Sequence, residues 1–566
     1  MMKHWRINLI FIFIIIFGAA IIGRLFFLQV LNQNYWRALA KGQQKLFLEI
    51  PGERGEIFIK DKNDNLYSLA VNKEWPFVYV APNEIERKEE TAQKLSEILE
   101  LDKDFILEKL NKETFYEVIK KKLDNEEIER LKESNLSGVY LEKERGRYYP
   151  QAFLTSQTVG FLDADGKGNY GIEGYYNDIL EGKEGFQEGE RSAQGFFLAF
   201  SERFLPAEKG SDLILTLDYN IQFMAEKLLK EAEENLEIEG GTIIIGDPVS
   251  GEILALANFP SFDPNEYSKV EDWDIFQNPA IQKIFEPGSA FKPIVIAAGL
   301  NEEKITPQTT YIDEGFVKIG GYTIYNYGNR VWGQKTITEV LEKSINTGAV
   351  FAEKQVGHNL FLEYIEKFGI FEPTGIDLDG EVSSENQEFK KGYEINFATA
   401  SFGQGIEMTP IQLFRAFSGI ANKGKMVKPY IVKKALINGE ETEVQPEVSG
   451  FQVISSQSAF QLTKMLVNVV EEGYAKGAKI PGYYIAGKTG TAQVPLAALE
   501  IKKSGYSDKT IQSFLGFAPA YNPHFLILVK LNNPKAKTAE YSAVPIFHEL
   551  AKYIIDYLQI PPDYEE

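Results

Sequence analysis

The sequence predicts a multidomain α+β protein of three parts, and three features of its 566 residues lead to this fold class. One apolar run stands near the N-terminus. Charged amphipathic helices then alternate with strand-like runs to residue 208, and strand-like runs stand at both ends of a long helical stretch. We expect a transmembrane helix within residues 1–30, an elongated α+β pedestal or dimerisation-like domain over 31–208, and a C-terminal domain over 209–566. The C-terminal domain should hold a mixed sheet flanked by helices, together with an all-α lobe.

Composition excludes several kinds of site and partner. The chain has 60 Lys and Arg against 81 Asp and Glu, a net charge of −21, which disfavours a nucleic-acid partner because phosphate backbones are repelled. The absence of cysteine excludes thiol nucleophiles, disulfides and thiolate zinc sites. The four histidines show no ligand spacing, so we expect no metal centre and no cofactor.

The apolar run from Ile7 to Gly23 is the candidate membrane anchor. It contains no charged residue, is close to the minimum length for a span, and follows the basic residues Lys3 and Arg6. Basic residues ahead of a span favour a cytoplasmic N-terminus, so most of the chain would lie outside the plasma membrane. A cleaved signal peptide is the alternative, since residues 18–20 are small, but the apolar run continues past them. We therefore expect a retained single-pass anchor.

The stretch from residue 51 to 208 shows no spacing typical of a catalytic site. Pro51 to Phe58 is typical of a turn that enters a strand, and between Glu84 and Glu133 apolar residues recur at helical spacing among Lys and Glu. These patterns predict small helices with solvated charged faces. We interpret the pedestal as a spacer or docking module.

The C-terminal domain begins near Lys209 with a strand, a long helix from Asn220, and a hairpin around residues 248–251. Helical patterns follow to about Lys476. The remaining predicted elements are strands at Tyr483–Gln493, Ser513–Ala518 and Phe525–Lys530, and a last helix at Val544–Leu558.

Ser289 and Lys292 form the first candidate catalytic motif. They stand three residues apart, after a Pro-Gly turn and before an apolar helix, so both side chains should lie on one helical face. A serine hydroxyl needs a neighbouring base, and a lysine can serve if burial and a second cation lower its pKa. The helix N-terminus would favour developing negative charge.

Ser344 and Asn346 form the second motif, on a short connector between two helical patterns. Their hydroxyl and amide could point into one cleft, where Ser344 could relay a proton to a leaving amine and Asn346 could bind a substrate amide. Taken alone, Asn346 is more typical of a helix cap than of a substrate-binding residue.

The third motif is Lys488-Thr489-Gly490-Thr491, which follows a strand-like run. A glycine within a strand marks a place where another backbone approaches closely, which suits a peptide laid along a strand edge. Lys488 would supply positive charge for a carboxylate, and Thr489 and Thr491 would donate hydrogen bonds. The alternative is an ordinary glycine-bearing turn with an exposed lysine.

The three motifs together resemble the S-x-x-K, S-x-N and K-T-G set of penicillin-binding proteins and serine β-lactamases, with gaps of 55 and 144 residues between their first members. Over nearly its whole length the chain is similar to class B penicillin-binding proteins, which are monofunctional peptidoglycan transpeptidases. Further matching segments are Arg24–Phe26, Arg54–Ile57, Arg147–Pro150, Gly171–Gly174, Ala255–Ala257 with Pro260, Asp263–Asn265, Phe402–Gly405 and Ser513–Phe517.

The resemblance implies a fold with a penicillin-binding transpeptidase domain and a role for each motif residue. Ser289 would be the acylated nucleophile and Lys292 its base, with Ser344 and Asn346 on the cleft wall. The substrate-binding strand would comprise Lys488, Thr489, Gly490 and Thr491, and the backbone N–H groups of Ser289 and Thr491 would form the oxyanion hole.

The same resemblance implies the substrate and the partners. Ser289 would attack the penultimate carbonyl of a stem peptide that ends in D-Ala-D-Ala, and an amine of a neighbouring stem peptide would resolve the acyl-enzyme into a cross-link. The stem peptides are carried on a polymer made from lipid-linked precursor, β-lactams would acylate the same serine, and the implied protein partner is a polytopic membrane glycosyltransferase.

Three other functions share part of these features: a D,D-carboxypeptidase, a serine β-lactamase, and an inactive wall-synthesis scaffold or lactam sensor. After Ser344 the chain lacks the E-x-x-x-N loop of class A β-lactamases, and it also lacks the glycosyltransferase pattern of bifunctional enzymes. Glu286, directly before Pro287, resembles division-type enzymes, which favours a septal over a lateral role.

Overall fold

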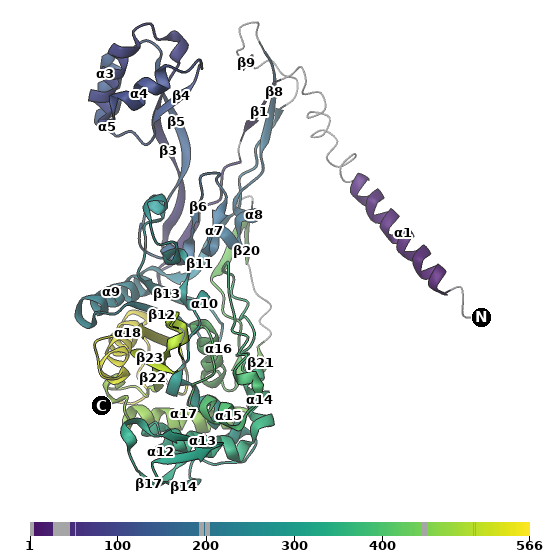
Figure 1. Cartoon of the computed structure of the whole chain (residues 1–566), viewed down its shortest axis with the longest axis vertical. Coiled ribbons are helices and arrows are strands. Elements are labelled where there is room, and N and C mark those ends of the chain that lie inside the picture. Colours follow the sequence, from purple (N-terminus) through teal and green to yellow (C-terminus); the bar gives the residue numbers. More distant parts are fainter. Residues whose placement is uncertain are drawn as a thin grey trace. The chain divides into compact units, whose positions relative to one another are not determined.

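The computed structural model describes residues 5–26, 46–50, 52–191, 197–198, 204–437, 440–443, 450–501, 503 and 505–565. These fall into two compact units, one of Met1–Arg54 with Glu181–Gly210 and one of Gly55–Leu180 with Ser211–Glu566 (Figure 1). The domain boundaries expected at residues 30 and 208 stay a prediction.

The first unit holds helix α1 (Trp5–Phe26), which contains the apolar run, and a small antiparallel sheet. In this sheet β8 (Gly185–Arg191) pairs with β1 (Leu46–Ile50), β9 (Phe197–Leu198) and β10 (Phe204–Leu205). Within the part of the chain that is described, none of the helices combines the length and the apolar character that crossing a bilayer requires.

The second unit begins with the predicted alternation of strands and charged helices. Helices α3 (Lys88–Leu99), α4 (Lys103–Leu110) and α5 (Asn125–Ser134) enclose a small core of their own beside the end of β3 (Figure 1). The larger sheet runs in the order β20-β19-β11-β2-β3-β4, with β5 also paired to β3. Its strands are β2 (Ile57–Lys60), β3 (Leu66–Val80), β4 (Glu117–Lys120), β5 (Val139–Tyr148), β11 (Asp212–Asp218), β19 (Val432–Ile437) and β20 (Glu440–Glu443).

Three of the segments on which the resemblance rests meet at a buried ion pair. Arg147 Nε donates to Glu173 Oε1 at 2.7 Å, and Arg147 Nη1 donates to the carbonyl oxygen of Gly55 at 2.7 Å. Both charged side chains are almost fully buried. Segments about 90 residues apart in the sequence are therefore fixed to one another. The short elements around them are α6 (Ser156–Val159), β6 (Phe161–Leu162), β7 (Gly168–Asn169), α7 (Gly171–Tyr175) and α8 (Asn177–Leu180).

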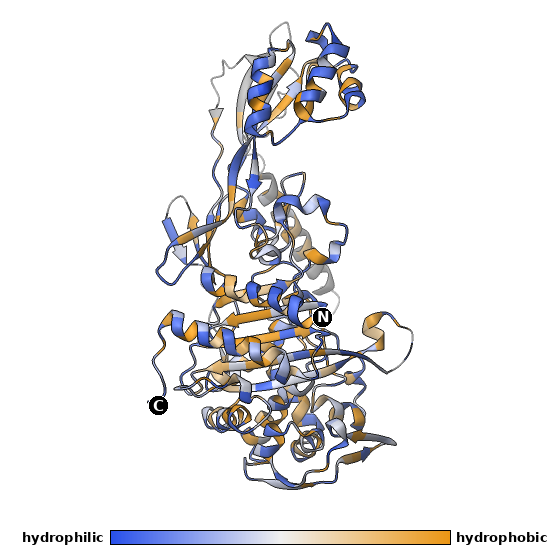
Figure 2. Cartoon of the chain, turned by 90° about the vertical axis from the view of Figure 1, so that its left-hand side faces the viewer, coloured by the Kyte–Doolittle hydropathy of each residue, from blue (hydrophilic) through white to orange (hydrophobic). Residues whose placement is uncertain are grey.

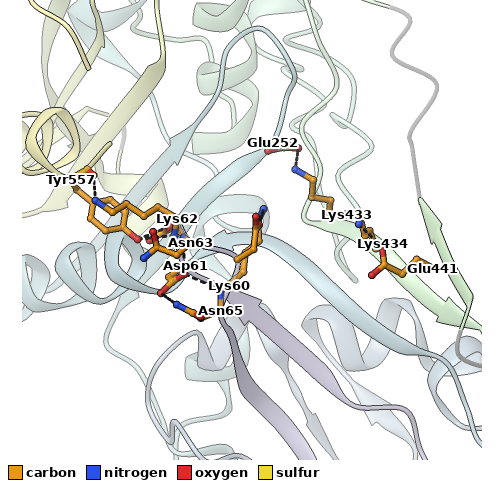
Figure 3. Close-up of polar contacts among 12 residues, drawn as sticks. Lys60, Asp61, Lys62, Asn63, Asn65, Glu252, Lys433, Lys434, Glu441 and Tyr557 are labelled. Carbon is orange, nitrogen blue, oxygen red and sulfur yellow. Dashed lines mark hydrogen bonds and ion pairs between the residues drawn. The ribbon is translucent and has the colours of Figure 1, made fainter. Parts of the chain in front are cut away.

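The tip of the β2–β3 hairpin contacts the C-terminal helix α18 (Ala543–Leu558) (Figure 3). Asp61 Oδ1 accepts hydrogen bonds from the N–H groups of Asn63 and Asn65 at 2.8 and 3.0 Å, which closes the turn. Lys62 then donates twice to Tyr557, from its N–H to the hydroxyl at 2.9 Å and from Nζ to the carbonyl oxygen at 2.7 Å. These contacts tie the larger sheet to the C-terminal domain.

The C-terminal domain is built on a five-stranded sheet in the order β13-β12-β24-β23-β22. Its strands are β12 (Gly240–Gly246), β13 (Ile253–Phe259), β22 (Ala486–Pro495), β23 (Tyr506–Ala518) and β24 (Phe525–Asn532). Figure 2 shows orange, hydrophobic strands in the middle of the molecule, beside paler and bluer ones. All four pairings are antiparallel, so the expected mixed sheet is wrong for this domain. Short connections join β12 to β13 and β22 through β24, and such connections allow only antiparallel neighbours. The parallel pair, β2 with β11, belongs to the larger sheet.

Helices cover both faces of the five-stranded sheet. A Cβ at Gly516 would lie 2.8 Å from the Phe547 ring of α18. A Cβ at Gly246, in the adjacent row of the sheet, would lie 3.0 Å from Phe414 of α16 (Pro410–Ala421). Because successive rows of a pleated sheet point to opposite faces, α18 and α16 lie on opposite sides. Further helices of this domain are α9 (Tyr219–Leu236), α10 (Pro279–Gln282), α11 (Lys292–Asn301) and α17 (Ser456–Glu471).

The sequence predicted an all-α lobe beside this sheet, and this prediction is wrong because the lobe also contains strands. It holds helices α12 (Ile337–Glu342), α13 (Asn346–Val356), α14 (His358–Lys367) and α15 (Glu394–Ala400). Between α11 and α12 the chain also forms two hairpin-like pairs, β14 (Thr310–Asp313) with β17 (Gly333–Thr336) and β15 (Phe316–Ile319) with β16 (Tyr322–Tyr325). Gly320 and Gly321 both have positive φ and make the β15–β16 turn, which favours strands over helix. The remaining pair is β18 (Lys425–Met426) with β21 (Phe451–Gln452).

Candidate active site

Ser289 lies in a 3₁₀ turn, Gly288–Phe291, that leads directly into α11. The turn packs closely against the loop at Gly403, since Gly288 N–H donates to the Gly403 carbonyl oxygen at 2.9 Å. A Cβ at Gly403 would overlap the Gly288 backbone, and one at Gly288 would lie 3.1 Å from the Thr491 carbonyl oxygen. Glycine at these positions therefore lets the Ser289 turn sit between the loop and strand β22.

Lys292 is the first residue of α11 and is fully buried. Its N–H donates to the Ser289 carbonyl oxygen, and residues three apart in a 3₁₀ turn lie on the same side. Its Nζ donates to the Ser344 carbonyl oxygen at 2.6 Å and to Asn346 Oδ1 at 2.8 Å. In the described structure no hydrogen bond joins the Ser289 hydroxyl to Lys292. Burial, with a smaller effect of nearby Lys488, holds the pKa of Lys292 well below its ordinary value.

Ser344 follows the C-cap residue of helix α12 and has a left-handed conformation, with φ of +51°. The Ser344 N–H donates to the Leu341 carbonyl oxygen and the Ile345 N–H to that of Val340, which is the Schellman arrangement. This position usually holds glycine because a Cβ is unfavourable there. The local backbone favours glycine at this position, so the hydroxyl of Ser344 is present despite backbone strain.

The Ser344 hydroxyl lies between two buried lysines. Lys488 Nζ donates to Ser344 Oγ at 2.9 Å, and Lys292 Nζ lies 3.4 Å from the same oxygen. Lys488 also donates to the Thr489 carbonyl oxygen at 3.0 Å, and burial lowers its pKa to about 7. Lys488 is fully buried behind the cleft, so the alternative of an exposed lysine in a turn is wrong.

Strand β22 presents the third motif at the edge of the five-stranded sheet, as predicted. A Cβ at Gly490 would overlap Ser513 Oγ and lie 2.8 Å from the Pro287 carbonyl oxygen. The backbone that approaches Gly490 is therefore the chain's own Ser289 turn rather than a substrate. Thr489 and Thr491 flank this contact and line the cleft.

All three motifs border one cleft of about 740 Å³. Ser289, Ser344, Asn346, Thr489 and Thr491 line it, while Lys292 and Lys488 lie buried behind its wall. The other residues that line the cleft were not predicted from the sequence. Most of them come from the region of strands β14–β17, which was not predicted, and from residues 537–541 before α18. The missed side chains include Tyr325, Tyr327, Arg330, Trp332, Lys343, Tyr474, Lys537, Glu540 and Tyr541.

A network of buried polar side chains positions the Ser344–Asn346 segment. The sequence analysis did not predict this network. Asn326 Oδ1 accepts hydrogen bonds from the N–H groups of Asn346 and Thr347, both at 3.1 Å, so Asn326 caps α13. Asn326 Nδ2 donates to Asp313, whose buried carboxylate also accepts from Thr347 Oγ1 at 2.6 Å. Asn346 donates instead to the Tyr325 carbonyl oxygen at 3.1 Å. The reading of Asn346 as a helix cap is therefore wrong, because another asparagine caps its helix.

Glu286 lies buried behind the Ser289 turn. Its Oε1 accepts from the Gly405 N–H at 3.0 Å, and the Tyr506 hydroxyl donates to Oε2 at 3.1 Å. Burial raises the pKa of Glu286 to about 7, an effect that these hydrogen bonds oppose and that the negative charge of Glu407 reinforces. Its protonation state therefore changes near neutral pH.

Two family models match the chain. The penicillin-binding protein transpeptidase domain matches residues 241–552, and the penicillin-binding protein dimerisation domain matches residues 49–215. Stage V sporulation protein D of Bacillus subtilis is 31% identical over 97% of this chain and 86% of its own length. The probable peptidoglycan D,D-transpeptidase PbpC of Pseudomonas aeruginosa is 30% identical over 99% of this chain and 96% of its own.

Solved structures agree with these matches. The crystal structure of penicillin-binding protein 3 from Mycobacterium tuberculosis complexed with aztreonam has a TM-score of 0.70 and 27% identity to this chain. The match covers 91% of this chain and 98% of that one.

The left-handed backbone at Ser344 predicts an unusual order of stability among its variants. Ser344→Gly should unfold at a higher denaturant concentration than Ser344→Ala, by about 1 kcal/mol, because only glycine adopts this φ without strain. The matched pair Ser418→Gly and Ser418→Ala, in the last turn of α16, should show the reverse order, since glycine weakens a regular helix. Equal unfolding midpoints for the two Ser344 variants would contradict the interpretation.

The raised pKa of Glu286 predicts a pH-dependent stability. The folded state holds a proton on Glu286 up to about pH 7, whereas the unfolded chain loses it near pH 4.5. The contribution of Glu286 to stability is therefore present below pH 4.5 and decreases as the pH rises to 7. Glu286→Gln should gain unfolding free energy relative to wild type between pH 5 and pH 8, measured by urea denaturation. A difference that does not change with pH would refute the assignment.

Proposed function

The chain belongs to the penicillin-binding protein transpeptidase family, and we propose that it is a class B peptidoglycan D,D-transpeptidase that cross-links stem peptides through an acyl-serine. One observation carries the proposal. The Ser344 hydroxyl lies within hydrogen-bonding distance of two buried lysines, in a cleft that Ser289 also lines. Two buried amines without a carboxylate partner, both beside the Ser344 hydroxyl, suit proton transfer, because burial favours a neutral amine that can accept a proton.

Acylation begins with Lys292 as the base that takes the proton of the Ser289 hydroxyl. Ser289 Oγ bonds to the penultimate carbonyl carbon of a stem peptide that ends in D-Ala-D-Ala, and the N–H groups of Ser289 and Thr491 stabilise the oxyanion. Ser344, in contact with both lysines, passes a proton to the leaving nitrogen. The carbon–nitrogen bond then breaks and D-Ala leaves.

Deacylation uses the same groups in reverse. An amine of a second stem peptide attacks the ester carbonyl, its proton passes to the amine groups of the site, and Ser289 recovers its hydroxyl hydrogen. The product is an amide cross-link. A water molecule in place of the amine would make the enzyme a D,D-carboxypeptidase, so the acceptor alone separates these two activities.

The edge strand β22 gives the stem peptide a place to bind. Its outer edge can pair with an extended peptide, as strand addition requires, and Thr489 and Thr491 can donate to the terminal carboxylate. Lys488 lies behind this wall, so we assign it to holding Ser344 rather than to direct contact with substrate.

The β-lactamase alternative requires a carboxylate poised to activate water. Glu381, a carboxylate that follows Ser344 in the chain, accepts hydrogen bonds from the backbone N–H groups of Thr374 and Gly375 at 2.6 and 2.8 Å. Glu540 is the one acidic side chain among the described residues that line the cleft. These contacts favour a slowly released acyl-enzyme over rapid lactam turnover. The septal role remains a prediction that rests on Glu286.

The acyl-serine assignment is tested by covalent labelling. Wild-type protein should bind fluorescent penicillin, and Ser289→Ala should lose the label completely, because the proposed mechanism forms the ester on the Ser289 oxygen. Ser507→Ala, at a serine of β23 whose hydroxyl donates to the Val494 carbonyl oxygen, should label like wild type. Undiminished labelling of Ser289→Ala would overturn the proposal. Rapid turnover of nitrocefin would instead indicate a β-lactamase, and D-Ala release without cross-linked product a carboxypeptidase.

We also propose that α1 anchors the protein in the plasma membrane, with the N-terminus cytoplasmic. The support comes from the sequence, where the uncharged run Ile7–Gly23 is close to the minimum length of a span and is preceded by the basic residues Lys3 and Arg6. This location would place the cleft on the extracytoplasmic side, where a polytopic membrane glycosyltransferase could supply the polymer.

Cell fractionation tests the anchor. The full chain should sediment with membranes and resist extraction by high salt, and a chain that begins at residue 27 should be released from them. External protease should degrade the bulk of the full chain in spheroplasts. Recovery of the full chain in the soluble fraction would contradict the proposed location.

A further inference from the structure

Arg330 is a charged residue of the cleft wall for which the mechanism above has no use. It lies on the loop between β16 and β17, and its exposed side chain lines the same cleft as Ser289 and Ser344. Over the described parts of the chain, its recorded side-chain partners are Tyr474 and Trp332, and no carboxylate pairs with it. An arginine that faces a cleft without an anionic partner has guanidinium donors available for a ligand.

Two aromatic rings hold this guanidinium. Its central carbon lies 5.9 Å from the centroid of Trp332 and 5.8 Å from that of Tyr474, and Nη1 donates to the Tyr474 hydroxyl. Cation–π contacts of this kind restrict the side chain without neutralising its charge. Less conformational entropy is then lost when the guanidinium binds a ligand.

The loop that carries Arg330 is fixed to the catalytic segment by the network of Asp313 and Asn326. Asn326 Nδ2 donates to the Arg330 carbonyl oxygen at 3.1 Å, and the Trp332 N–H donates to Asp313 Oδ2 at 2.8 Å. The same Asn326 caps the helix that begins at Asn346. Both network side chains are buried, so the loop and the Asn346 segment are held to one pair of buried groups. The position of Arg330 relative to the reacting groups is therefore built into the fold.

The charge of the cleft points to an anionic ligand. Its lining includes three basic residues, Arg330, Lys343 and Lys537, and one acidic residue, Glu540, whereas the whole chain has a net charge of −21. A positive cleft in an acidic protein concentrates anions. The planar fork of arginine matches a carboxylate with two parallel hydrogen bonds, which a lysine cannot reproduce.

We propose that Arg330 binds a free carboxylate on the stem-peptide residues that precede D-Ala-D-Ala, and so selects acidic over amidated peptides. This inference rests on the proposed function and adds a second carboxylate site to the one at Thr489 and Thr491. If D-Ala-D-Ala binds along β22 next to Ser289, the residues that precede it in the stem peptide can contact the rest of the cleft. This part of the cleft includes the wall that carries Arg330.

The test compares two synthetic stem peptides that end in D-Ala-D-Ala and differ only upstream, where one has free carboxylates and the other carboxamides. D-Ala release gives kcat/KM for each peptide. For wild type the acid peptide should be favoured about ten- to hundredfold, as expected for a charge-assisted bidentate contact. Arg330→Ala should bring this ratio to about one, chiefly through KM for the acid peptide. Arg330→Lys should give an intermediate ratio.

The matched control is Lys318→Ala. Lys318 is an exposed cation of the same lobe, 5.8 Å from the centroid of the Phe316 ring, and it lies outside the cleft lining. The control should keep the wild-type ratio. A ratio unchanged in Arg330→Ala, or lowered equally in Lys318→Ala, would overturn the assignment of Arg330 while leaving the transpeptidase function intact. A wild-type protein that neither releases D-Ala nor binds fluorescent penicillin would overturn the proposed function and this inference with it.

Discussion

The site depends on burying two lysine amines around one serine hydroxyl without a carboxylate to neutralise them. Lys292 and Lys488 are both fully buried, and their recorded partners within the described chain are oxygens of Ser344, Asn346 and Thr489. Desolvation of an unpaired ammonium costs several kcal/mol, and the protein lowers this cost by favouring the neutral amine. Surface Lys391 shows the contrast, because its hydrogen bond to Glu388 raises its pKa. An ion pair of that kind at Lys292 would remove the base that the chemistry requires.

This arrangement requires three chain segments to approach more closely than side chains normally allow. The Ser289 turn lies between the loop at Gly403 and strand β22 at Gly490, and at both glycines an added Cβ would overlap neighbouring atoms. The close contact excludes water from the space behind Ser289, and this dry environment lowers the pKa of each lysine. The same close backbone contacts therefore shape the cleft and lower the pKa of the two lysine amines.

Much of the scaffold could be predicted from the sequence because its signals are local. The β12–β13 hairpin, α9, α18 and the three strands β22 to β24 follow from periodicity and turn residues, and the structure confirms them. The direction of pairing in the sheet was wrong, because periodicity does not say which strands become neighbours. The β15–β16 hairpin was missed although Gly320-Gly321 between alternating residues is a hairpin signal. The motif residues could be predicted because the three motifs are short sequence patterns that occur in a fixed order. Their burial could not be predicted, since the burial of Lys488 depends on helices and strands far away in the sequence.

The network of Asp313 and Asn326 was beyond any pattern in the sequence, and it explains why the missed strands belong to the site. Asp313 ends β14 and Asn326 follows β16, so the two small strand pairs bring an amide and a carboxylate to the start of α13. A helix whose own N-cap residue is Ile345, which has no side-chain oxygen, needs such a cap from elsewhere. The strands that supply it also carry the loop with Arg330 and Trp332. The lobe therefore fixes the Asn346 segment and the cleft wall with one set of hydrogen bonds, so a change to either buried side chain would disturb proton transfer and peptide selection together.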